Sequence, residues 1–562
     1  MKRILLSLAF ATALVQPLAA QPGQQQGTVV PLAAGATDMN LLRIERIGRD
    51  SSQVQRLAQV LLDSIGPRLG GTPGQKSAVD WAVKTLNSWG IEAKAERYGT
   101  WRQWRRGHSH IDLMTPRVRS LEGMMLGYSP GTGGKDVTAT TVILPNIPMK
   151  MVNGQPVADS TEFVKWLPAV KDKFVLVSAA QPTCRPTSDW DENATPESKA
   201  RMDSLKQATT QGWNARVRAT GFSLGLGTGG LGRRLEQAGA AGIITSRPKN
   251  AWGTIEIFES YNEKAPAVGL SCEDYSLVYR LTENNQGPKI RLNLDAELQA
   301  EAPIYNVVAM IKGSQLPDEY VVLSAHFDSW DGGSGATDDG AGSLSQLEAI
   351  RILKQVYPKP KRTILIGLWA AEEHGLIGSR AFTEDHPEVL KGLQTAFNED
   401  GGTGRIQRIS AAGLPNAAVH IQEWLSKLPP AFNAAMQFGG VGTPSGGGSD
   451  NSSFSCHGLP GFGLGGQNWN YGNYTWHTQR DTYDKIIFDD LKFNASLTAM
   501  LAYLASEDAT MITRERVDLM ALAQQRAAQN PPAAGGQGGG GQPPMMTWPT
   551  CNMAPRMTNP RL

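Results

Sequence analysis

Cysteine is scarce in this sequence of 562 residues, and no long apolar run follows its first 20 residues. The four cysteines form no CxxC pair, which excludes the common zinc-thiolate and dithiol redox motifs. Because a membrane-spanning helix needs roughly 20 consecutive apolar residues, no later segment is expected to cross a bilayer. The net charge of +2 is too small to indicate a nucleic-acid partner. The composition fits a globular protein that is long enough for several domains.

The first 20 residues have the pattern of a secretory signal peptide. Two basic residues precede an apolar stretch from Ile4 to Val15, and small residues follow up to Ala20. This stretch is shorter than a transmembrane anchor requires. We therefore expect an exported protein, either periplasmic or secreted into the medium, in which disulfides can form.

Composition also changes towards both ends of the remaining chain. Residues 21–37 are rich in Gln, Gly and Ala and are expected to form a flexible leader. Residues 513–562 are expected to hold the end of a helix and then a low-complexity tail. Trp548 and Cys551 in this tail could fix its far end to the body of the protein.

Strand and helix patterns alternate in the main domain, which we expect at 38–130 and 293–512. Apolar runs such as "EYVVLSAH", "RTILIGLW" and "LQTAFNE" are separated by amphipathic helices such as "GSLSQLEAIRILKQV". This order indicates an α/β fold with a buried, mostly parallel sheet flanked by helices. Residues 131–292 show short strand patterns, one helix-strand unit at "RRLEQAGAAGIITS" and no cluster of histidines with carboxylates. Because residues 42–100 already have the pattern of the first helices of the main domain, we expect an inserted second domain there.

Chemically active side chains follow three of the expected strands in the main domain. They are His326 and Asp328, Glu372 and Glu373, and Asp400. Since the carboxyl ends of parallel strands meet at one edge of a sheet, these side chains should converge. So many buried carboxylates would repel one another unless a cation lay among them. Imidazole and carboxylate ligands without thiolate favour Zn²⁺, with Mn²⁺ or Co²⁺ as substitutes, and His477 in "YTWHTQRDTYD" supplies the second histidine that two ions would need.

Four motifs in this order resemble the di-zinc exopeptidase family that includes bacterial leucyl aminopeptidases, carboxypeptidase Q and glutamate carboxypeptidases. The motifs are "HFDSWDGGSGATDDGAG", "LWAAEEHGLIGS", "NEDGG" and "HTQRDTYD". The resemblance covers roughly residues 40–130 and 295–510 and implies a metallo-exopeptidase with a zinc-exopeptidase-type sheet. "LEQAGAAGIIT" in the insert is similar to the mainly-β protease-associated domain that several family members carry.

The resemblance also implies a role for each residue of the site. The ligands of two zinc ions would be His326, Asp338, Glu373, Asp400 and His477. Asp338 would bridge the ions, with His326 and Asp400 on one and Glu373 and His477 on the other. Glu372 matches the general base that takes a proton from water, and Asp328 would orient His326 through its second ring nitrogen.

Several neighbouring residues have weaker expectations. His374 follows the two glutamates but is expected at the surface, and Trp330 and Asp331 are expected either to line the substrate pocket or to anchor their loop. The basic run "WRQWRRGHSH" at 101–110 fits a solvated face or, as an alternative, a carboxylate-binding pocket.

Cysteine pairing is a separate expectation from the domain order. Cys184 and Cys272 both fall in the insert, where a disulfide would staple a domain with little visible core, so we expect them to pair. Four cysteines allow three pairings, and spacing alone does not decide among them.

The polarity of cleavage stays open between two alternatives. We favour an aminopeptidase or dipeptidase, because a free substrate amine can bind zinc or pair with a carboxylate of this acidic site. A carboxypeptidase of the same family is the main alternative, and a glutaminyl cyclase or an inactive binding protein on this scaffold are others. The expected partner is a peptide substrate, and the oligomeric state is open, with a dimer as one option.

Overall fold

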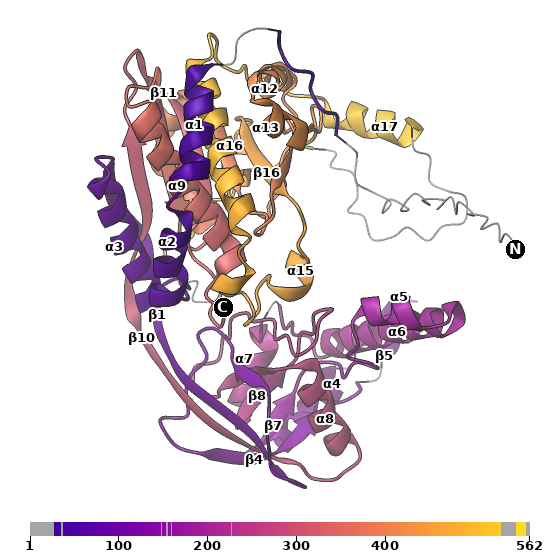
Figure 1. The fold of residues 1–562 in the computed structure, drawn as a ribbon. Helices are drawn as coiled ribbons and strands as arrows, with labels where there is room; N and C mark the ends of the chain where they lie inside the picture. The colour runs from indigo at the N-terminus through magenta and orange to yellow at the C-terminus, as the bar shows by residue number, and fades with distance from the viewer. Residues whose placement is uncertain are drawn as a thin grey trace, which may run out of the picture.

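The computed structural model describes residues 27–34, 38–147, 149–152, 155–158, 160–225, 227–529 and 547–557. The expected signal peptide lies outside the described residues, as does most of the leader. Figure 1 shows two parts, a larger upper part that contains α1, α9 and α16, and a smaller lower part that contains α4 to α8.

A mostly parallel sheet forms the centre of the larger part. Its middle strands, in spatial order, are β16 (Gly461–Gly466), β13 (Leu393–Glu399), β11 (Leu316–His326), β12 (Arg362–Trp369) and β10 (Lys289–Ile311). β11 runs parallel to β12 and β13, β13 runs parallel to β16, and β10 is antiparallel to β12. All eight residues of β12 are buried, because helices cover both faces of the sheet. The predicted α/β class is confirmed.

Helices pack on both faces of this sheet. One face carries α1 (Met39–Asp50), α2 (Val54–Ala58), α3 (Pro73–Ser88), α9 (Ala341–Val356) and α16 (Phe488–Glu507), and the other carries α10 (Ile377–Asp385), α11 (Pro387–Lys391) and α14 (Ser452–Ser455). Thr72 begins α3 by accepting a hydrogen bond from the Gln75 amide at 3.3 Å, and Pro73 occupies the first turn.

Shorter elements complete the larger part. They are η1 (Gln59–Ile65), η3 (Ala336–Gly340), β14 (Ile406–Ile409), α12 (Pro415–Lys427), α13 (Pro430–Ala435), β15 (Gln437–Phe438), α15 (Tyr471–Tyr474), η4 (Tyr483–Lys485) and α17 (Leu519–Gln529).

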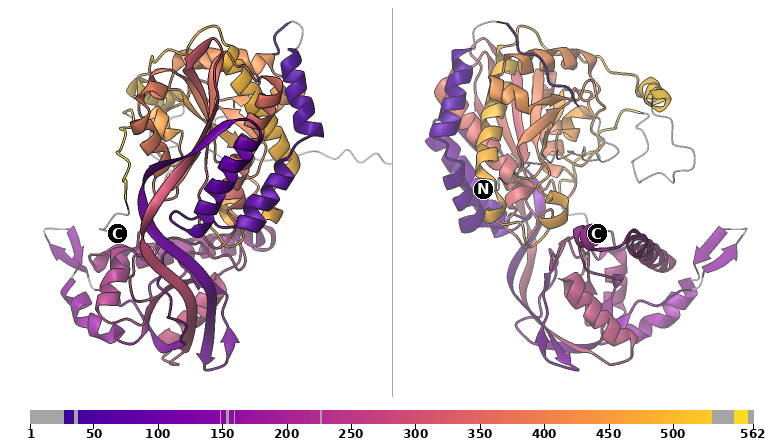
Figure 2. Two further views of the ribbon diagram at one scale, coloured as in Figure 1. Left: turned by 90° about the vertical axis from the view of Figure 1, so that its left-hand side faces the viewer. Right: turned by 45° about the vertical axis from the view of Figure 1, so that its right-hand side comes forward.

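Two long antiparallel strands connect the two parts of the molecule. β1 (Glu92–Thr115) and β10 are 24 and 23 residues long, and the left view of Figure 2 shows them running from the upper part into the lower part. Four shifts of register interrupt their pairing. Because β10 also pairs with β12 at one end and with β4 (Val137–Ile143) at the other, a continuous hydrogen-bonded path joins the sheets of both parts.

The smaller part contains the predicted insert and is built around a second, parallel sheet. β4, β7 (Phe174–Leu176), β8 (Gly242–Thr245) and β9 (Ala267–Leu270) lie parallel in this order, and β3 (Gly123–Met125) closes the edge. The other elements are β2 (Arg119–Ser120), β5 (Met149–Val152), β6 (Gln155–Ala158), α4 (Ser160–Trp166), η2 (Leu167–Val170), α5 (Thr187–Asn193), α6 (Pro196–Ala219), α7 (Gly229–Gln237) and α8 (Cys272–Glu283).

The expectation of a mainly-β insert is wrong. α6 alone has 24 residues, whereas each of the parallel strands of the insert has at most seven. The sequence analysis did not predict α6, because this helix buries only Trp213 and Ala219 and lacks the apolar periodicity by which amphipathic helices are recognised.

Two disulfides fasten the chain. Cys184 pairs with Cys272 inside the insert, as predicted. Cys456 pairs with Cys551, and the indole of Trp548 donates a hydrogen bond to the carbonyl of Val517 at 3.2 Å. The predicted attachment of the far end of the tail to the body is therefore confirmed. Within the described residues, no helix has the length and apolarity needed to cross a membrane.

Candidate metal centre

Strand ends and two loops bring the candidate ligands together at the carboxyl edge of the large sheet. His326 is the last residue of β11, Asp400 follows β13, and Glu373 lies four residues beyond the end of β12. Asp338 lies in η3, just before α9, and His477 follows α15. Residues that are as much as 151 positions apart in the sequence thus meet in one place, and all five are at least partly buried.

The five side chains form two groups that share Asp338. In the first group, His326 Nε2 lies 3.3 Å from Asp338 Oδ1 and 3.7 Å from Asp400 Oδ1. In the second, His477 Nε2 lies 3.2 Å from Asp338 Oδ2 and 3.0 Å from Glu373 Oε2. Asp338 therefore offers one carboxylate oxygen to each group, which is the arrangement expected of a bridging ligand.

The donor set and its spacing fit two zinc ions. Two ligand atoms bound to one tetrahedral zinc lie about 3.3–3.6 Å apart, since each is about 2.0–2.2 Å from the metal. The distances within both groups are close to this range, and buried oxygens of Asp338 and Glu373 have no hydrogen-bond partner among the described residues. Burial alone would lower the pKa of His477, but Glu373 and Asp338 outweigh it and raise the pKa to about 10. The carboxylates thus favour positive charge between them.

Glu372 lies beside these groups without belonging to either. It lines the same cleft as Asp338, Asp400 and His477. Burial raises the pKa of its carboxyl well above the ordinary value, and the negative charge of Asp400 acts in the same direction. A carboxyl group with a raised pKa next to candidate metal ligands is suited to accepting and releasing a proton.

Asp328 has a geometry that differs from the expected one. Its carboxylate accepts hydrogen bonds from the amides of Glu372 at 3.0 Å and Glu373 at 3.3 Å. The nearer partner of His326 Nδ1 is the main-chain carbonyl of Asp328, at 3.1 Å, whereas the carboxylate oxygen is 3.7 Å away. The side chain of Asp328 therefore fixes the turn that presents both glutamates, and its backbone orients His326.

The insert forms one wall of the centre. The Ile257 amide donates to the His477 carbonyl at 2.8 Å, and the ring of Phe258 meets the His477 ring edge-on at 5.0 Å. Gln479 holds the same segment, because its side chain accepts from the Ile255 amide at 2.7 Å and donates to the Gly253 carbonyl at 2.6 Å. The loop that carries His477 is thus held by residues more than 200 positions earlier in the chain.

The expectation that His374 lies at the surface is wrong. Its side chain is 3% exposed, its ring stacks on Trp101 at 5.2 Å, and its Nε2 lies 2.8 Å from the Tyr128 hydroxyl. Nδ1 faces the carboxylate of Glu259 from the insert at 3.2 Å. Burial would lower the pKa of His374, but Glu259 raises it, so the two form an ion pair at the edge of the cleft.

Trp330 and Asp331 are loop anchors. Trp330 is 6% exposed and packs against Phe258, and the Asp331 carboxylate forms an ion pair with Arg106. Arg106 belongs to the basic run on β1, and its side chain is only 15% exposed. The expectation of a solvated face is therefore wrong for Arg106, although Arg105 is half-exposed and pairs with Asp295.

Two buried aspartates of the centre escaped the sequence analysis. Asp481 accepts hydrogen bonds from the amides of Thr337 at 2.7 Å and Asp338 at 3.0 Å, so it shapes the segment that carries Asp338. Burial raises its pKa to about 7. Asp450 is fully buried with a pKa that burial also raises to about 7. The signal for Asp481 was its place in "HTQRDTYD", four residues after His477, whereas Asp450 in a glycine-rich run gave none.

The cleft over these residues has a volume of about 640 Å³. Its walls include five acidic residues and one basic residue, Arg380, together with aromatic side chains such as Trp476 and Tyr471. Within the described part of the chain, no carboxylate forms an ion pair with the Arg380 guanidinium. This cation is therefore available to a negatively charged group in the cleft.

Comparisons with known proteins agree with this geometry. Residues 306–502 match the family model described as Peptidase family M28. Carboxypeptidase Q of Bos taurus is 24% identical over 480 residues, which are 85% of this chain and 91% of that protein. Carboxypeptidase Q of Homo sapiens is 23% identical over 460 residues, which are 82% of this chain and 86% of that protein.

Solved structures show the same fold. A peptidase M28 precursor from Shewanella amazonensis has 26% identity and a TM-score of 0.62, and the match covers 85% of this chain and 99% of that one. BSAP, a zinc aminopeptidase from Bacillus subtilis, has 18% identity and a TM-score of 0.53 over 83% of this chain and 97% of its own. The resemblance to this peptidase family is confirmed for residues 306–502, which contain all five candidate ligands.

Proposed function

We propose, from the membership of residues 306–502 in peptidase family M28, that this chain is an exported two-zinc exopeptidase. The observation that carries the proposal is the pair of ligand groups that share Asp338. His326 and Asp400 would hold one ion, and Glu373 and His477 the other. The names of two similar proteins, carboxypeptidase Q and a zinc aminopeptidase, support the class of reaction.

Residues of this chain would divide the chemistry among them. When bound, two zinc ions would polarise a peptide carbonyl and would lower the pKa of water enough for it to act as a nucleophile at neutral pH. Glu372 would accept the proton of the attacking water and deliver it to the leaving amine, for which its raised pKa suits it. Asp328 holds the amides of Glu372 and Glu373, so it would keep the base and a ligand in register.

Metal content is the direct test of this function. We expect about two zinc ions per chain, loss of peptide hydrolysis after dialysis against a strong chelator, and recovery with zinc or cobalt. Full activity in metal-free protein would refute the proposal. A chain that held one ion and cyclised amino-terminal glutamine would be a glutaminyl cyclase, and a chain without metal or turnover would be a binding protein.

For the polarity of cleavage, two observations favour different ends of the substrate. The acidic cleft favours a free amine and therefore an aminopeptidase or a dipeptidase. Arg380 favours a second candidate, a carboxypeptidase, because a substrate carboxylate could pair with its guanidinium. Comparing one peptide with its N-acetylated and C-amidated forms decides this. Loss of hydrolysis on acetylation alone supports the aminopeptidase, and loss on amidation alone supports the carboxypeptidase.

The remaining assignments are also proposals. The catalytic domain would comprise 38–130 and 293–512, and the insert at 131–292 would be a protease-associated-like domain, for which the position of "LEQAGAAGIIT" on α7 and β8 is the support. Export is supported by two disulfides, which form in oxidising compartments. Mass determination of the mature protein from culture fractions would locate the cleavage and the compartment.

A further inference from the structure

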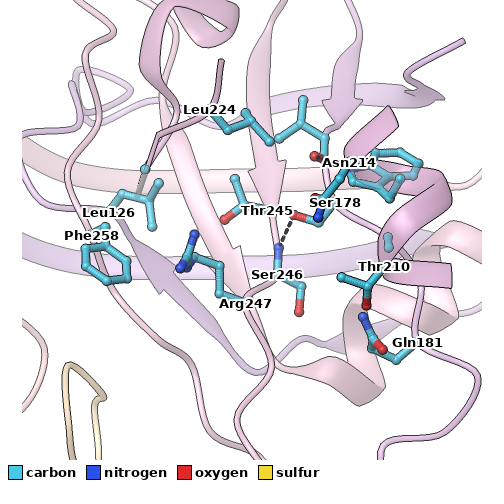
Figure 3. Close-up of a pocket in the computed structure, with 14 residues that line it drawn as sticks. Leu126, Ser178, Gln181, Thr210, Asn214, Leu224, Thr245, Ser246, Arg247 and Phe258 are labelled. Carbon is cyan, nitrogen blue, oxygen red and sulfur yellow. Dashed lines mark hydrogen bonds between the residues drawn. The ribbon is translucent and has the colours of Figure 1, made fainter. Parts of the chain in front are cut away.

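A second cavity, of about 150 Å³, lies inside the insert (Figure 3). It opens at the carboxyl ends of the parallel strands β7 and β8, where ligands bind in open α/β sheets. Ser178 lies two residues beyond the end of β7, and Thr245 and Ser246 lie at the end of β8. Thr210 and Asn214 of α6 also line the cavity.

The strand ends offer hydrogen-bonding groups that the protein does not use up. The Ser246 amide donates to Ser178 Oγ at 2.9 Å, so the hydroxyl hydrogen of Ser178 can still be donated elsewhere. Ser246 is 7% exposed, and its Oγ is buried without a hydrogen-bond partner among the described residues. A buried hydroxyl in this state costs free energy unless a guest provides the missing bond.

The charge around the cavity is positive. Arg247 is the one charged residue among those that line it. Its Nε lies 2.8 Å from Glu256 Oε2, and Lys249 Nζ lies 2.7 Å from the other oxygen of the same carboxylate. Two cations thus share one anion, which leaves a net charge of about +1 beside the two serine hydroxyls. A carboxylate satisfies such a set of donors.

The remaining walls are apolar and limit the size of a guest. Leu126, Trp213, Leu224 and Phe258 provide carbon surface, and the Phe258 ring also packs under the Arg247 guanidinium at 4.7 Å. A cavity of about 150 Å³ is large enough to hold a benzene molecule. The room therefore limits the guest to about the size of one small free amino acid.

We propose that this cavity binds a free α-amino acid with an apolar side chain. Its carboxylate would contact Arg247, Ser246 and Ser178, its ammonium would face the side-chain oxygens of Thr210 and Asn214, and its side chain would lie against Leu126 and Phe258. The proposal rests on the proposed function in one respect, because an exopeptidase releases such amino acids as products.

The position of the cavity connects it to the metal centre. Phe258 lines the cavity and also contacts the ring of His477, and the adjacent Ile257 amide holds the His477 carbonyl. An occupant therefore packs on the segment that supports a candidate zinc ligand. Product bound here would act on turnover from outside the cleft.

Calorimetric titration of the metal-loaded full chain with L-leucine tests the site. We expect saturable binding that becomes about tenfold weaker or more in Arg247→Met, because a charge-assisted contact is lost. Ser246→Ala should also weaken binding, and Arg247→Lys should restore part of it. Ser276→Ala is the matched control, since Ser276 Oγ is likewise buried and unpartnered but lies on α8, away from the cavity.

Related probes separate the features of the ligand. L-Leucinamide, which lacks the carboxylate, and 4-methylpentanoate, which lacks the amine, should both bind more weakly than L-leucine. Equal binding of either compound would overturn the proposal of an amino-acid site, as would no binding of L-leucine at 10 mM, roughly the weak end of specific affinities. Leucine affinity that is unchanged in Arg247→Met would place the leucine in the zinc cleft and overturn it as well.

The same variants keep this inference distinct from the proposed function. Arg247→Met should retain the zinc content and peptide turnover of the unsubstituted protein in the absence of leucine, and its thermal unfolding should show an intact fold. If the unsubstituted protein bound leucine through Arg247 but had neither zinc nor peptidase activity, the proposed function would fail while the amino-acid site stood.

Discussion

Two cavities of this protein lie at the same place relative to a parallel sheet but are lined by side chains of opposite charge. Both lie at the carboxyl ends of parallel strands. The cleft of the candidate metal centre follows β11, β12 and β13, and the insert cavity follows β7 and β8. The first is lined by five acidic residues, whereas the second has Arg247 as its one charged lining residue. The sheet fixes where a guest can bind, and the residues that follow the strands decide its charge.

The largest effect should come from Glu372, the proposed general base of the cleft. Glu372→Gln should lower kcat by about 100-fold to 10,000-fold and keep the zinc, because the amide is nearly isosteric but cannot accept a proton. Glu373→Gln should instead lower the zinc content, since it removes a carboxylate oxygen of a proposed zinc ligand. Steady-state rates and atomic spectroscopy measure the two effects. The reverse pattern would exchange the roles of the two glutamates.

On the insert side of the comparison, the disulfide should matter most. Replacing Cys184 and Cys272 by serine should lower the free energy of unfolding by about 4 kcal/mol, because the crosslink closes a loop across 88 positions. Hydrogen exchange should locate the loss in α6 and α8. The matched replacement of Cys456 and Cys551 should loosen the tail around residue 551 and leave the exchange of the insert unchanged. An insert with unaltered protection after loss of its disulfide would contradict this expectation.

A pH measurement tests whether the carboxyl group of Glu399 is buried in its protonated form. Burial raises the pKa of Glu399 from 4.5 to about 8, although Asn494 donates to its carboxylate at 2.9 Å. The folded protein therefore keeps a proton that the unfolded chain loses, so the free energy of unfolding should fall as the pH rises from about 4.5 to 8.

Glu399→Gln provides the control, because its side chain does not ionise. Thermal unfolding between pH 5 and 8, with and without metal, should show a weaker pH dependence for this variant. Equal slopes for both proteins would show that Glu399 is ionised in the folded state.

The smallest effect concerns the contact between the two regions. Gln479→Ala removes both hydrogen bonds to the 253–255 segment and should weaken zinc binding about tenfold, because the loop of His477 loses support. Competition with a metal-binding dye measures the affinity. Gln467→Ala, which follows β16 and lies outside this contact, serves as a comparison, and equal affinities in the two variants would rule out the support.

Sequence reasoning predicted the large sheet well because local patterns encode it. The last six residues of β11 and all of β12 and β13 are buried, so each strand contains a continuous apolar run, and the reactive residues lie at or shortly after the strand ends. The motifs therefore named all five residues that the structure brings into two groups.

Contacts between distant segments were beyond that reasoning. Glu259 and Phe258 reach the centre from the insert, and no local pattern relates them to His374 or His477. For the same reason His374 was expected at the surface, because its burial depends on Trp101 and Tyr128 rather than on its own neighbours in sequence. The polar α6 was missed because it buries only two of its residues and therefore has no apolar stripe.

The ribbon of β1 and β10 gives the molecule a mechanical property. Ile111 and Leu113 of β1 and Ile290 and Leu292 of β10 belong to the core of the smaller part, whereas Val307 and Ile311 belong to the core of the larger part. A force that pulls the two parts away from each other along the ribbon loads many backbone hydrogen bonds at once, as in shear, rather than one after another. The two parts should therefore separate only at a high force, and the hydrogen bonds between β1 and β10 should break in a single step.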